Sequence, residues 1–271
     1  MRALAILVSL LLAVMSPAVR AQALPYHADP SAREIVPDLS AVPAIRFLTT
    51  ADFPPFNYRD VSGELIGFNI DLARELCDEL GLACTIQAWP WEQASSALAD
   101  NQGDALIAGL EITPENGELF DFSSIYLALP GRFVTRLEDA VGFDPAALAG
   151  RTVAVRRGST HATFVARYLP EVELAGYESE PAALEALEAE AVDAFFGDAM
   201  RAAFWLNQNL TCCDFAGEGY FRPDFFGHGL AIAVQSGDDA VRRALDYGLL
   251  RLKRTGVMDE IYLRWFPVSF Y

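Results

Sequence analysis

Two positions along the chain have residue types that suit the opposite charges of a small ligand. Gly158, Ser159 and Thr160 precede a helix that is predicted to begin near His161. A helix N-terminus exposes backbone N–H groups that bind anions, and a glycine lets a ligand approach them closely. Serine and threonine are also ordinary helix caps, and both roles can hold together. This segment is a candidate anion site.

Asp198 is the candidate for the opposite charge, because it stands just past the predicted strand 192–196. Ligands of open α/β sheets sit outside the carboxyl ends of the strands. A buried carboxylate at such a place suits an ammonium or guanidinium group. The same aspartate is also a suitable N-cap for the helix that follows it.

The sequence gives no sign of catalysis or of a bound cofactor. His27, His161 and His228 have no evident serine or cysteine partner, and His161 is expected to be an exposed residue of a first helical turn. No GxxxxGK[ST] loop is present to hold nucleotide phosphates. No histidine or second cysteine pair stands at metal-ligand spacing. We therefore expect neither an enzyme nor a cofactor or metal site.

Alternating strand and helix patterns must position these residues. The first unit has predicted strands at 44–49, 65–68, 84–88 and 105–110, a helix capped by Asn69 and ending at Gly81, and a helix at 92–99 stopped by Gly103. The second has strands at 152–155, 172–177 and 192–196 and helices at 161–168, 181–189 and 198–206. Helices at 238–255 and 257–265 close the chain. This alternation predicts mainly parallel sheets with helices on both faces.

Two extended stretches, 127–136 and 229–234, are predicted to cross between the two units as a hinge. Roughly 250 mature residues exceed the usual size of one domain. The predicted architecture is an α/β fold with two lobes and a two-strand hinge. Lobe 1 is expected to contain 44–132 and 228–271, and lobe 2 is expected to contain 133–227. A ligand cleft is expected between the facing edges of the lobes.

The N-terminus predicts export. Arg2 is followed by an apolar run up to Met15 that is too short to span a bilayer comfortably. Small residues then allow cleavage of a signal peptide 1–21 after Ala21, or after Ala23. Loss of Arg2 and Arg20 changes the formal charge from −17 to −17 − 2 = −19. An acidic chain without a basic patch disfavours nucleic acid as a partner, and 22–43 is predicted to be a flexible lead-in.

Four cysteines remain in what is expected to be an oxidising compartment. Cys77 and Cys84 stand at the end of one predicted helix and the start of the next strand, a separation that a disulfide can close. Cys212 and Cys213 are adjacent in sequence. They are compatible with a vicinal disulfide, with two free thiols or with an intermolecular bond, and the sequence leaves these alternatives open.

Several motifs follow one another in a characteristic order. They are Phe53-Pro54-Pro55-Phe56, Gly67-Phe68-Asn69-Ile70-Asp71-Leu72, Asp104-Ala105-Leu106-Ile107-Ala108-Gly109, Ile112-Thr113-Pro114-Glu115, Phe120-Asp121-Phe122-Ser123, Gly158-Ser159-Thr160-His161, Val192-Asp193-Ala194-Phe195-Phe196-Gly197-Asp198, and a tail with Gly256, Ile261-Tyr262 and Trp265-Phe266-Pro267. Together they resemble the polar amino-acid solute-binding proteins of ABC transporters, which are family 3 extracellular solute-binding proteins with the type II periplasmic-binding fold. The likeness covers residues 44–271. It implies a disulfide between Cys77 and Cys84, as some members have.

The resemblance also implies a ligand site. Phe53 and Trp91 would form its aromatic walls, and Gly109 would belong to a lobe 1 segment, 109–116, that borders the ligand. Lobe 2 would contribute Gly158, Ser159 and Thr160, and Asp198 would hold the ligand amine. The function implied is capture of an amino acid or a related amine or polar solute by lobe closure. The partner implied is an ABC permease in the inner membrane, and the chain is expected to be a periplasmic monomer.

The sequence departs from the family at the carboxylate clamp. Asn116 stands where the family usually has arginine, and Glu111 stands where it often has serine. If Glu111 faces the cleft, the ligand is expected to lack a free α-carboxylate; the alternative is a side chain turned to solvent. Arg132 or Arg157 could instead replace the missing guanidinium, although each also suits a structural or solvent-facing place.

Two other functions are alternatives, and the residues alone do not separate the first of them from transport. A sensor would present its closed form to a membrane receptor rather than to a permease. A dehydratase acting on prephenate-like acids also uses this fold, and Glu111 could serve as its acid. Such substrates are dicarboxylates, and a site without the family's arginine is poorly suited to bind them.

Overall fold

The computed structural model describes residues 36–266 and 268–271 of the 271-residue chain. The predicted signal peptide, both cleavage positions and most of the lead-in lie outside the described residues. The described end of the lead-in includes a 3-10 turn, η2 (Leu39–Ala41), and the side chain of Val42 is 2% exposed. These last residues pack against the first lobe, so the lead-in is not uniformly flexible up to residue 43.

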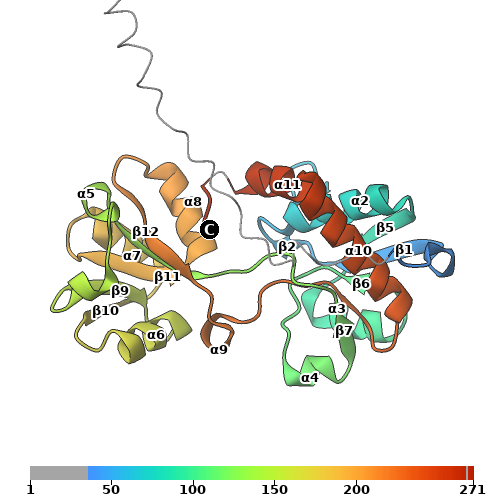
Figure 1. The fold of residues 1–271 in the computed structure, drawn as a ribbon, viewed down its shortest axis with the longest axis horizontal. Coiled ribbons are helices and arrows are strands. Elements are labelled where there is room, and N and C mark those ends of the chain that lie inside the picture. Colours follow the sequence, from blue (N-terminus) through green and yellow to red (C-terminus); the bar gives the residue numbers. More distant parts are fainter. Residues whose placement is uncertain (1–35, 267) are drawn as a thin grey trace, which may run out of the picture.

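The first lobe contains a five-stranded sheet in the order β5-β1-β6-β13-β7 (Figure 1). The strands are β1 (Ala44–Thr49), β5 (Ala83–Ala88), β6 (Ala105–Leu106), β7 (Phe120–Phe122) and β13 (Ala233–Gln235). β1 pairs in parallel with β5 and β6, and β13 pairs antiparallel with β6 and β7. Four strands therefore run in one direction, and only β13 is reversed.

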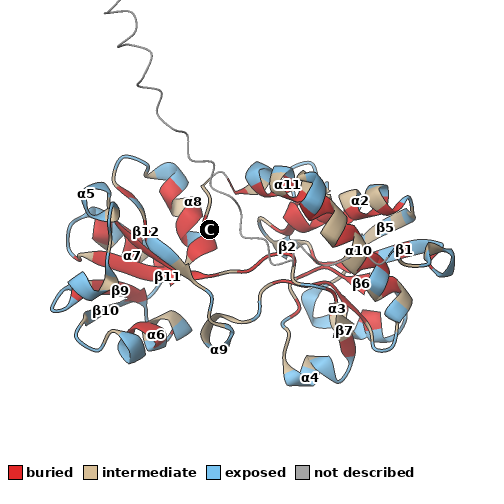
Figure 2. Cartoon of the chain, viewed as in Figure 1, coloured by how far each residue is buried: buried red, intermediate tan, exposed pale blue. Residues whose placement is uncertain are grey.

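Helices cover both faces of this sheet because side chains alternate along a strand. Ile45 and Phe47 of β1 belong to the same core as three helices, α2 (Phe68–Leu80), α10 (Asp239–Thr255) and α11 (Val257–Trp265). Leu48 packs on the opposite face with α3 (Trp91–Ala99). Figure 2 shows the central strands mostly buried and the outer helix faces exposed, whereas the edge strand β5 has no buried residue. None of the helices in the described part of the chain has an apolar stretch sufficient for a membrane span.

The second lobe repeats this arrangement in the order β10-β9-β11-β8-β12. Its strands are β8 (Gly131–Arg136), β9 (Thr152–Arg156), β10 (Glu173–Tyr177), β11 (Ala194–Asp198) and β12 (Cys213–Tyr220). β9 is parallel to β10 and β11, whereas β8 is antiparallel to β11 and β12. One face packs on α7 (Glu180–Glu188) and α8 (Ala199–Gln208), and the other packs on α6 (Thr160–Tyr168).

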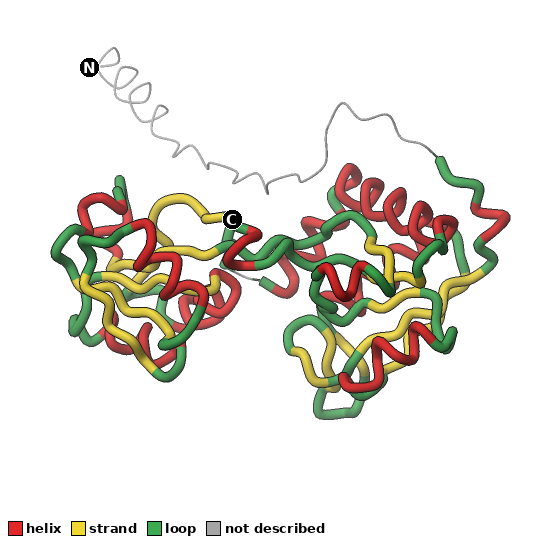
Figure 3. The backbone as a smooth tube through the Cα atoms, turned by 90° about the horizontal axis from the view of Figure 1, so that it is seen from below, coloured by secondary structure: helices red, strands yellow, loops and turns green. Residues whose placement is uncertain are grey.

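Two extended segments connect the sheets, as Figure 3 shows from a second direction. They meet in an antiparallel bridge between Leu127 and Leu230, whose N–H donates to the Leu127 carbonyl at 2.7 Å. The chain enters the second sheet through β8 and returns to the first through β13, and these are the two reversed strands. The two-lobed α/β fold with a two-strand hinge is thus confirmed, whereas the exact lobe boundaries at 132/133 and 227/228 stay a prediction.

The C-terminal residues return to the crossing segments. The Tyr271 hydroxyl donates to the Ala128 carbonyl at 2.8 Å and accepts from its N–H at 3.1 Å. The buried Arg132 side chain donates to the Phe270 carbonyl at 3.3 Å. The shorter elements are β2 (Asp52–Phe53), β3 (Asn57–Arg59), β4 (Leu65–Ile66), α4 (Pro114–Gly117), α5 (Leu137–Ala140), η3 (Pro145–Leu148) and α9 (Pro223–Phe226).

Three local predictions differ from the structure. Asn69 does not cap α2: Gly67 is the N-cap, and the buried Asn69 amide donates to Asn57 Oδ1 at 2.8 Å inside the fold. The first-lobe strand predicted at 105–110 is paired only at Ala105–Leu106. The helix predicted at 92–99 matches α3, but its stop differs: Asp100 caps the helix directly after Ala99, before Gly103 is reached.

Both cysteine pairs are bonded in the structure. The disulfide Cys77–Cys84 joins the end of α2 to β5, with the two Cα atoms 6.1 Å apart. Cys212 and Cys213 form a vicinal disulfide at the start of β12, so the structure matches the first of the three alternatives for this pair.

The disulfide at Cys77–Cys84 predicts a stability loss when it is removed. Replacing both residues by alanine is expected to lower the free energy of unfolding by about 2.5 kcal/mol, because the bond restricts the unfolded chain. Urea unfolding followed by circular dichroism measures this. The control replaces Cys212 and Cys213, whose loop is much shorter and whose loss should therefore be smaller. Equal losses in the two variants would contradict the argument.

Candidate functional site

The strand registers place the carboxyl ends of both sheets beside the crossing segments. Asp198, the last residue of β11, pairs with Gly131, the first residue of β8. Leu106, the last residue of β6, pairs with Ala233, the first residue of β13. Each crossing chain thus enters its sheet next to the carboxyl end of a parallel strand. Ligands of such sheets bind at these ends, so the two binding edges lie toward the hinge.

The anion candidate forms the N-terminus of α6. Ser159 is its N-cap: the hydroxyl accepts from Ala162 N–H at 3.1 Å and donates to the Arg156 carbonyl at 2.7 Å. The side chain is 4% exposed, so this hydroxyl serves the protein itself, as an ordinary cap does. Gly158 has φ +69° and open space where a Cβ would stand. Thr160 is exposed, and the first N–H groups of a helix lack partners within it.

His161 differs from the expectation of an exposed residue. Its ring is half-buried and stacks on Phe226 of α9, with ring centroids 4.5 Å apart and an interplanar angle of 12°. Burial, together with the charges of Arg156 and Arg201, lowers the pKa of His161 to about 4. The imidazole is therefore neutral at pH 7. Phe226 of α9 and Phe196 of β11, two aromatic residues from different parts of the chain, cover the ring.

The structure shows one of the two expected roles of Asp198, that of a helix cap. Asp198 is the N-cap of α8, and its Oδ1 accepts from Arg201 N–H at 2.9 Å. The residue is half-buried at the carboxyl end of β11. Burial raises the pKa of the Asp198 carboxyl, while the Arg201 N–H and the charge of Arg201 oppose this shift. A ligand cation that approaches this edge would favour the charged form of the carboxyl.

In the first lobe, the structure brings Phe53 and Gly109 together. The Phe53 ring stacks on Phe56 with centroids 4.7 Å apart. A Cβ at Gly109, whose φ is +80°, would lie 3.0 Å from the Phe53 ring, so only glycine fits without movement. Trp91 is the first residue of α3 and is 46% exposed. Its ring is therefore not part of the core and remains available at the surface.

The two unusual residues of the 109–116 segment are also described. The Asn116 amide donates to the Glu111 carbonyl at 2.7 Å, and its N–H donates to Thr113 Oγ1 at 3.2 Å. Asn116 thereby ties α4 to the preceding residue Glu111. Unlike an arginine at this position, it has no positive charge for a ligand carboxylate. The Glu111 side chain is exposed, which fits the reading that turns it to solvent.

Neither arginine proposed as a replacement clamp has a free guanidinium. Arg132 is 6% exposed and donates to the Gly217 carbonyl at 2.8 Å as well as to Phe270. Arg157 pairs with Glu178 at 2.6 Å and donates to the Gly176 carbonyl at 2.9 Å. These contacts favour the structural reading of both residues.

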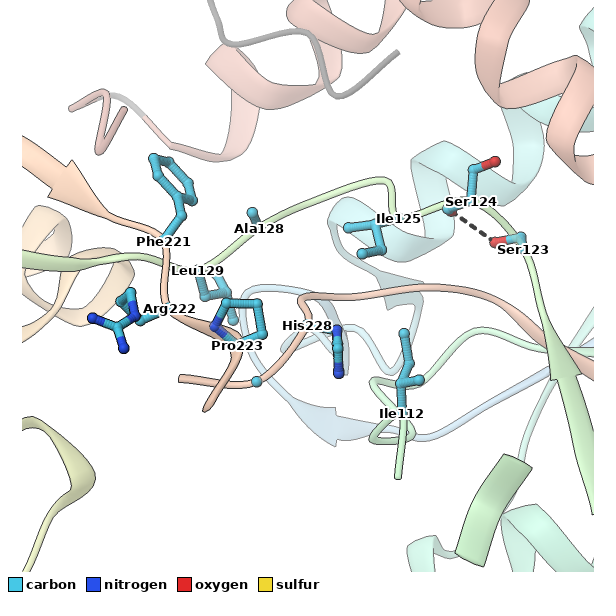
Figure 4. Close-up of a pocket in the computed structure, with 11 residues that line it drawn as sticks. Ile112, Ser123, Ser124, Ile125, Ala128, Leu129, Phe221, Arg222, Pro223 and His228 are labelled. Carbon is cyan, nitrogen blue, oxygen red and sulfur yellow. Dashed lines mark hydrogen bonds between the residues drawn. The ribbon is translucent and has the colours of Figure 1, made fainter. Parts of the chain in front are cut away.

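A cavity of about 630 Å³ lies between the crossing segments (Figure 4). Its lining includes Ile112 of lobe 1, Leu129 of the first crossing and His228 of the second. Arg222 also lines it, but its guanidinium is held by Asp224 at 2.8 Å and by the Tyr168 hydroxyl at 2.7 Å. None of the residues predicted to bind ligand is among its described lining. In the described ranges, no three histidine, cysteine or acidic side chains gather to hold a metal ion.

The double role of Asp198 predicts different effects of two substitutions. Asp198→Ala is expected to lower the free energy of unfolding by about 1 kcal/mol, because the N-cap is lost. Asp198→Asn keeps an acceptor and removes a charge whose burial opposes folding above the raised pKa, so it should be at least as stable as the native chain at pH 7.

Thermal unfolding at pH 7 and at pH 4 checks this. The advantage of asparagine should shrink toward acid pH, since protonation removes the same penalty from the aspartate. A loss in Asp198→Asn as large as that in Asp198→Ala would contradict this, because it would show that the carboxylate charge stabilises the fold and that the retained capping acceptor does not suffice.

Known proteins are similar to this chain in sequence and in fold. The ABC transporter arginine-binding protein 1 of Escherichia coli strain K12 is 31% identical over 228 residues, 84% of this chain and 93% of that protein. The L-cystine solute receptor of Neisseria gonorrhoeae, in its unliganded open conformation, superposes with a TM-score of 0.73 at 19% identity and covers 84% of this chain and 94% of its own.

A second structure with this fold belongs to a protein named for a different function. An ancestral cyclohexadienyl dehydratase superposes with a TM-score of 0.70 at 25% identity and covers 85% of this chain and 95% of its own. The family model of bacterial extracellular solute-binding proteins, family 3, matches residues 45–268. The chain therefore belongs to the family 3 bacterial extracellular solute-binding proteins.

Proposed function

We propose that this protein captures a cationic amino acid or a closely related amine between its two lobes. The observation that carries the proposal is Asp198, a half-buried carboxyl at the carboxyl end of β11. A carboxylate at that edge is complementary to an ammonium or guanidinium group. The similarity to an arginine-binding protein supports a ligand with an amino-acid skeleton and a second positive charge.

The remaining contacts follow from the same geometry. Phe53 and the exposed Trp91 offer aromatic faces, which attract cations as well as apolar groups. The ligand carboxylate, where one is present, would meet the N-terminus of α6 beside Gly158 and Thr160. Because Asn116 holds the Glu111 carbonyl, this anion contact would depend on backbone N–H groups rather than on a guanidinium.

Lobe closure is the mechanism that joins these surfaces. Phe53, Trp91 and Gly109 belong to one lobe, and Thr160 and Asp198 belong to the other. A ligand that touches both sets favours the closed form by its differential affinity for that form. The crossing segments around Leu127 and Leu230 would absorb the movement, as hinges do at a few backbone positions.

The cellular setting is part of the proposal. The chain would be exported by its N-terminal signal peptide and act as a monomer in the periplasm. Its closed form would dock on an ABC permease in the inner membrane and release its cargo there. A role as a sensor for a membrane receptor is the alternative, and it shares the same capture step.

A non-enzymatic role is supported by the similarity to the arginine-binding protein 1 of Escherichia coli, a protein that is named for binding. The dehydratase with this fold makes catalysis worth testing directly. In this chain the candidate acid for such a reaction, Glu111, has an exposed side chain. Incubation with a cyclohexadienyl acid is expected to leave that acid unchanged.

Ligand titration of the mature chain tests the proposal. L-Arginine at 100 times its Kd is expected to add about 2.7 kcal/mol of stability, which corresponds to roughly 5–10 °C in Tm for a protein of this size. Isothermal titration then gives the affinity of L-arginine, L-glutamine and agmatine. Agmatine lacks the carboxylate, so its affinity relative to L-arginine measures the anion contact.

The matched variants are Asp198→Asn and Asp214→Asn. Asp198→Asn should lose most of the L-arginine affinity, because the ligand cation loses its charged partner. Asp214 is exposed in β12, and its variant should bind as the native chain does. Absence of any thermal shift with amino acids or amines would overturn the proposed function.

A further inference from the structure

Glu180 is a buried acidic residue at the same edge of the second sheet as Asp198. It is the first residue of α7, directly after the N-cap Ser179, and it is 4% exposed. The helix follows β10, and the order β10-β9-β11 runs in parallel. The start of α7 and the end of β11 therefore lie at the same carboxyl edge.

The partner of Glu180 is Arg201. The Nε atom of Arg201 lies 3.4 Å from Glu180 Oε2, and that oxygen has no hydrogen bond within the described structure. A buried carboxylate oxygen without a hydrogen bond is unusual and calls for an explanation. The Arg201 side chain is 67% exposed, so the guanidinium reaches Glu180 from the open side of the edge.

Arg201 also stands close to Asp198. Its backbone N–H donates to Asp198 Oδ1 at 2.9 Å, and the two residues are three positions apart at the start of α8. Side chains at this spacing are neighbours on a helix, and opposite charges pair there readily. The guanidinium is nevertheless in an ion pair with Glu180 in the described structure. Glu180 thus competes with Asp198 for the same cation.

We propose that Glu180 is a positioning residue for cation recognition, which holds the Arg201 guanidinium away from the Asp198 carboxylate so that this carboxylate stays available to a ligand. The inference rests on the proposed function, because it assigns the ligand cation to Asp198. A tethered guanidinium would otherwise compete at high effective concentration with any cation in solution. Loss of Glu180 would release this competitor.

The surrounding charges agree with this reading. Burial raises the pKa of Glu180, the Asp198 charge raises it further, and Arg201 and Arg156 lower it. Two carboxyls therefore share one edge with two arginines. Arg156 is exposed at the end of β9, which leaves Arg201 as the arginine with a described contact to both acids, through its guanidinium to Glu180 and through its backbone N–H to Asp198.

A double-mutant cycle with L-arginine as the probe tests the proposal. Glu180→Gln is expected to weaken binding by about tenfold, within the range of coupling energies for residues in contact. Arg201→Gln should bind at least as well as the native chain. The double variant should return to within about threefold of the native affinity, because the competitor has gone. Glu185→Gln, on the exposed face of the same helix, is the control and should leave binding unchanged.

The outcomes separate this inference from the proposed function. Absence of amine or amino-acid binding by the native chain would contradict the proposed function. Native binding with an unchanged Glu180→Gln variant, or with a double variant as weak as Glu180→Gln, would overturn the positioning role.

A crystal structure of the Glu180→Gln variant without ligand is a second test of the proposal, and it does not depend on ligand binding. The proposal expects the Arg201 guanidinium within 4 Å of the Asp198 carboxylate, the usual limit of an ion pair. A guanidinium that stays apart from Asp198 would contradict it, and the same crystals show whether the variant folds.

Discussion

The antiparallel entry of each crossing strand into its sheet is the constraint on which this structure depends. Because β8 begins beside the end of β11 and β13 begins beside the end of β6, both sheets turn their carboxyl ends toward the hinge. A chain that crosses twice in this way cannot bring one binding edge to the hinge without the other. The ligand surfaces of two separate cores thus meet at one place, and the Leu127–Leu230 bridge ties the crossings together.

At the carboxyl edge of the second sheet, residues that are proposed to border the ligand also cap helices. Ser159 uses its hydroxyl to cap α6 and leaves the helix N-terminus and Gly158 open. Asp198 caps α8 with one oxygen and retains a second. A cap fixes the carboxylate in position before a ligand arrives, so less ordering is needed on binding. The negative charge available at this edge depends on whether the Arg201 guanidinium pairs with Asp198 or with Glu180. The buried Glu180 therefore influences ligand binding.

Much of the fold was predictable, because hydrophobic periodicity and caps act within a few residues. The α7 and α10 helices and the strand β1 follow from such patterns, and the Cys77–Cys84 bond follows from their spacing. The errors came from long-range contacts. Asn69 has the residue type of a cap, yet its amide is needed by Asn57, twelve positions earlier. The partners of Arg132 and Asn116 depend on tertiary contacts, and Glu180 carried no signal because its burial comes from the packing of α7 near α8.

Small-angle X-ray scattering of the protein, with and without saturating L-arginine, is the measurement that tests capture by lobe closure. If a ligand at the Asp198 edge draws the two lobes together about the crossing segments, the radius of gyration and the maximum dimension should both decrease in the presence of L-arginine. The Asp198→Asn variant should show no such change. Identical scattering curves for the native protein, under conditions where titration shows the site to be filled, would contradict capture by lobe closure.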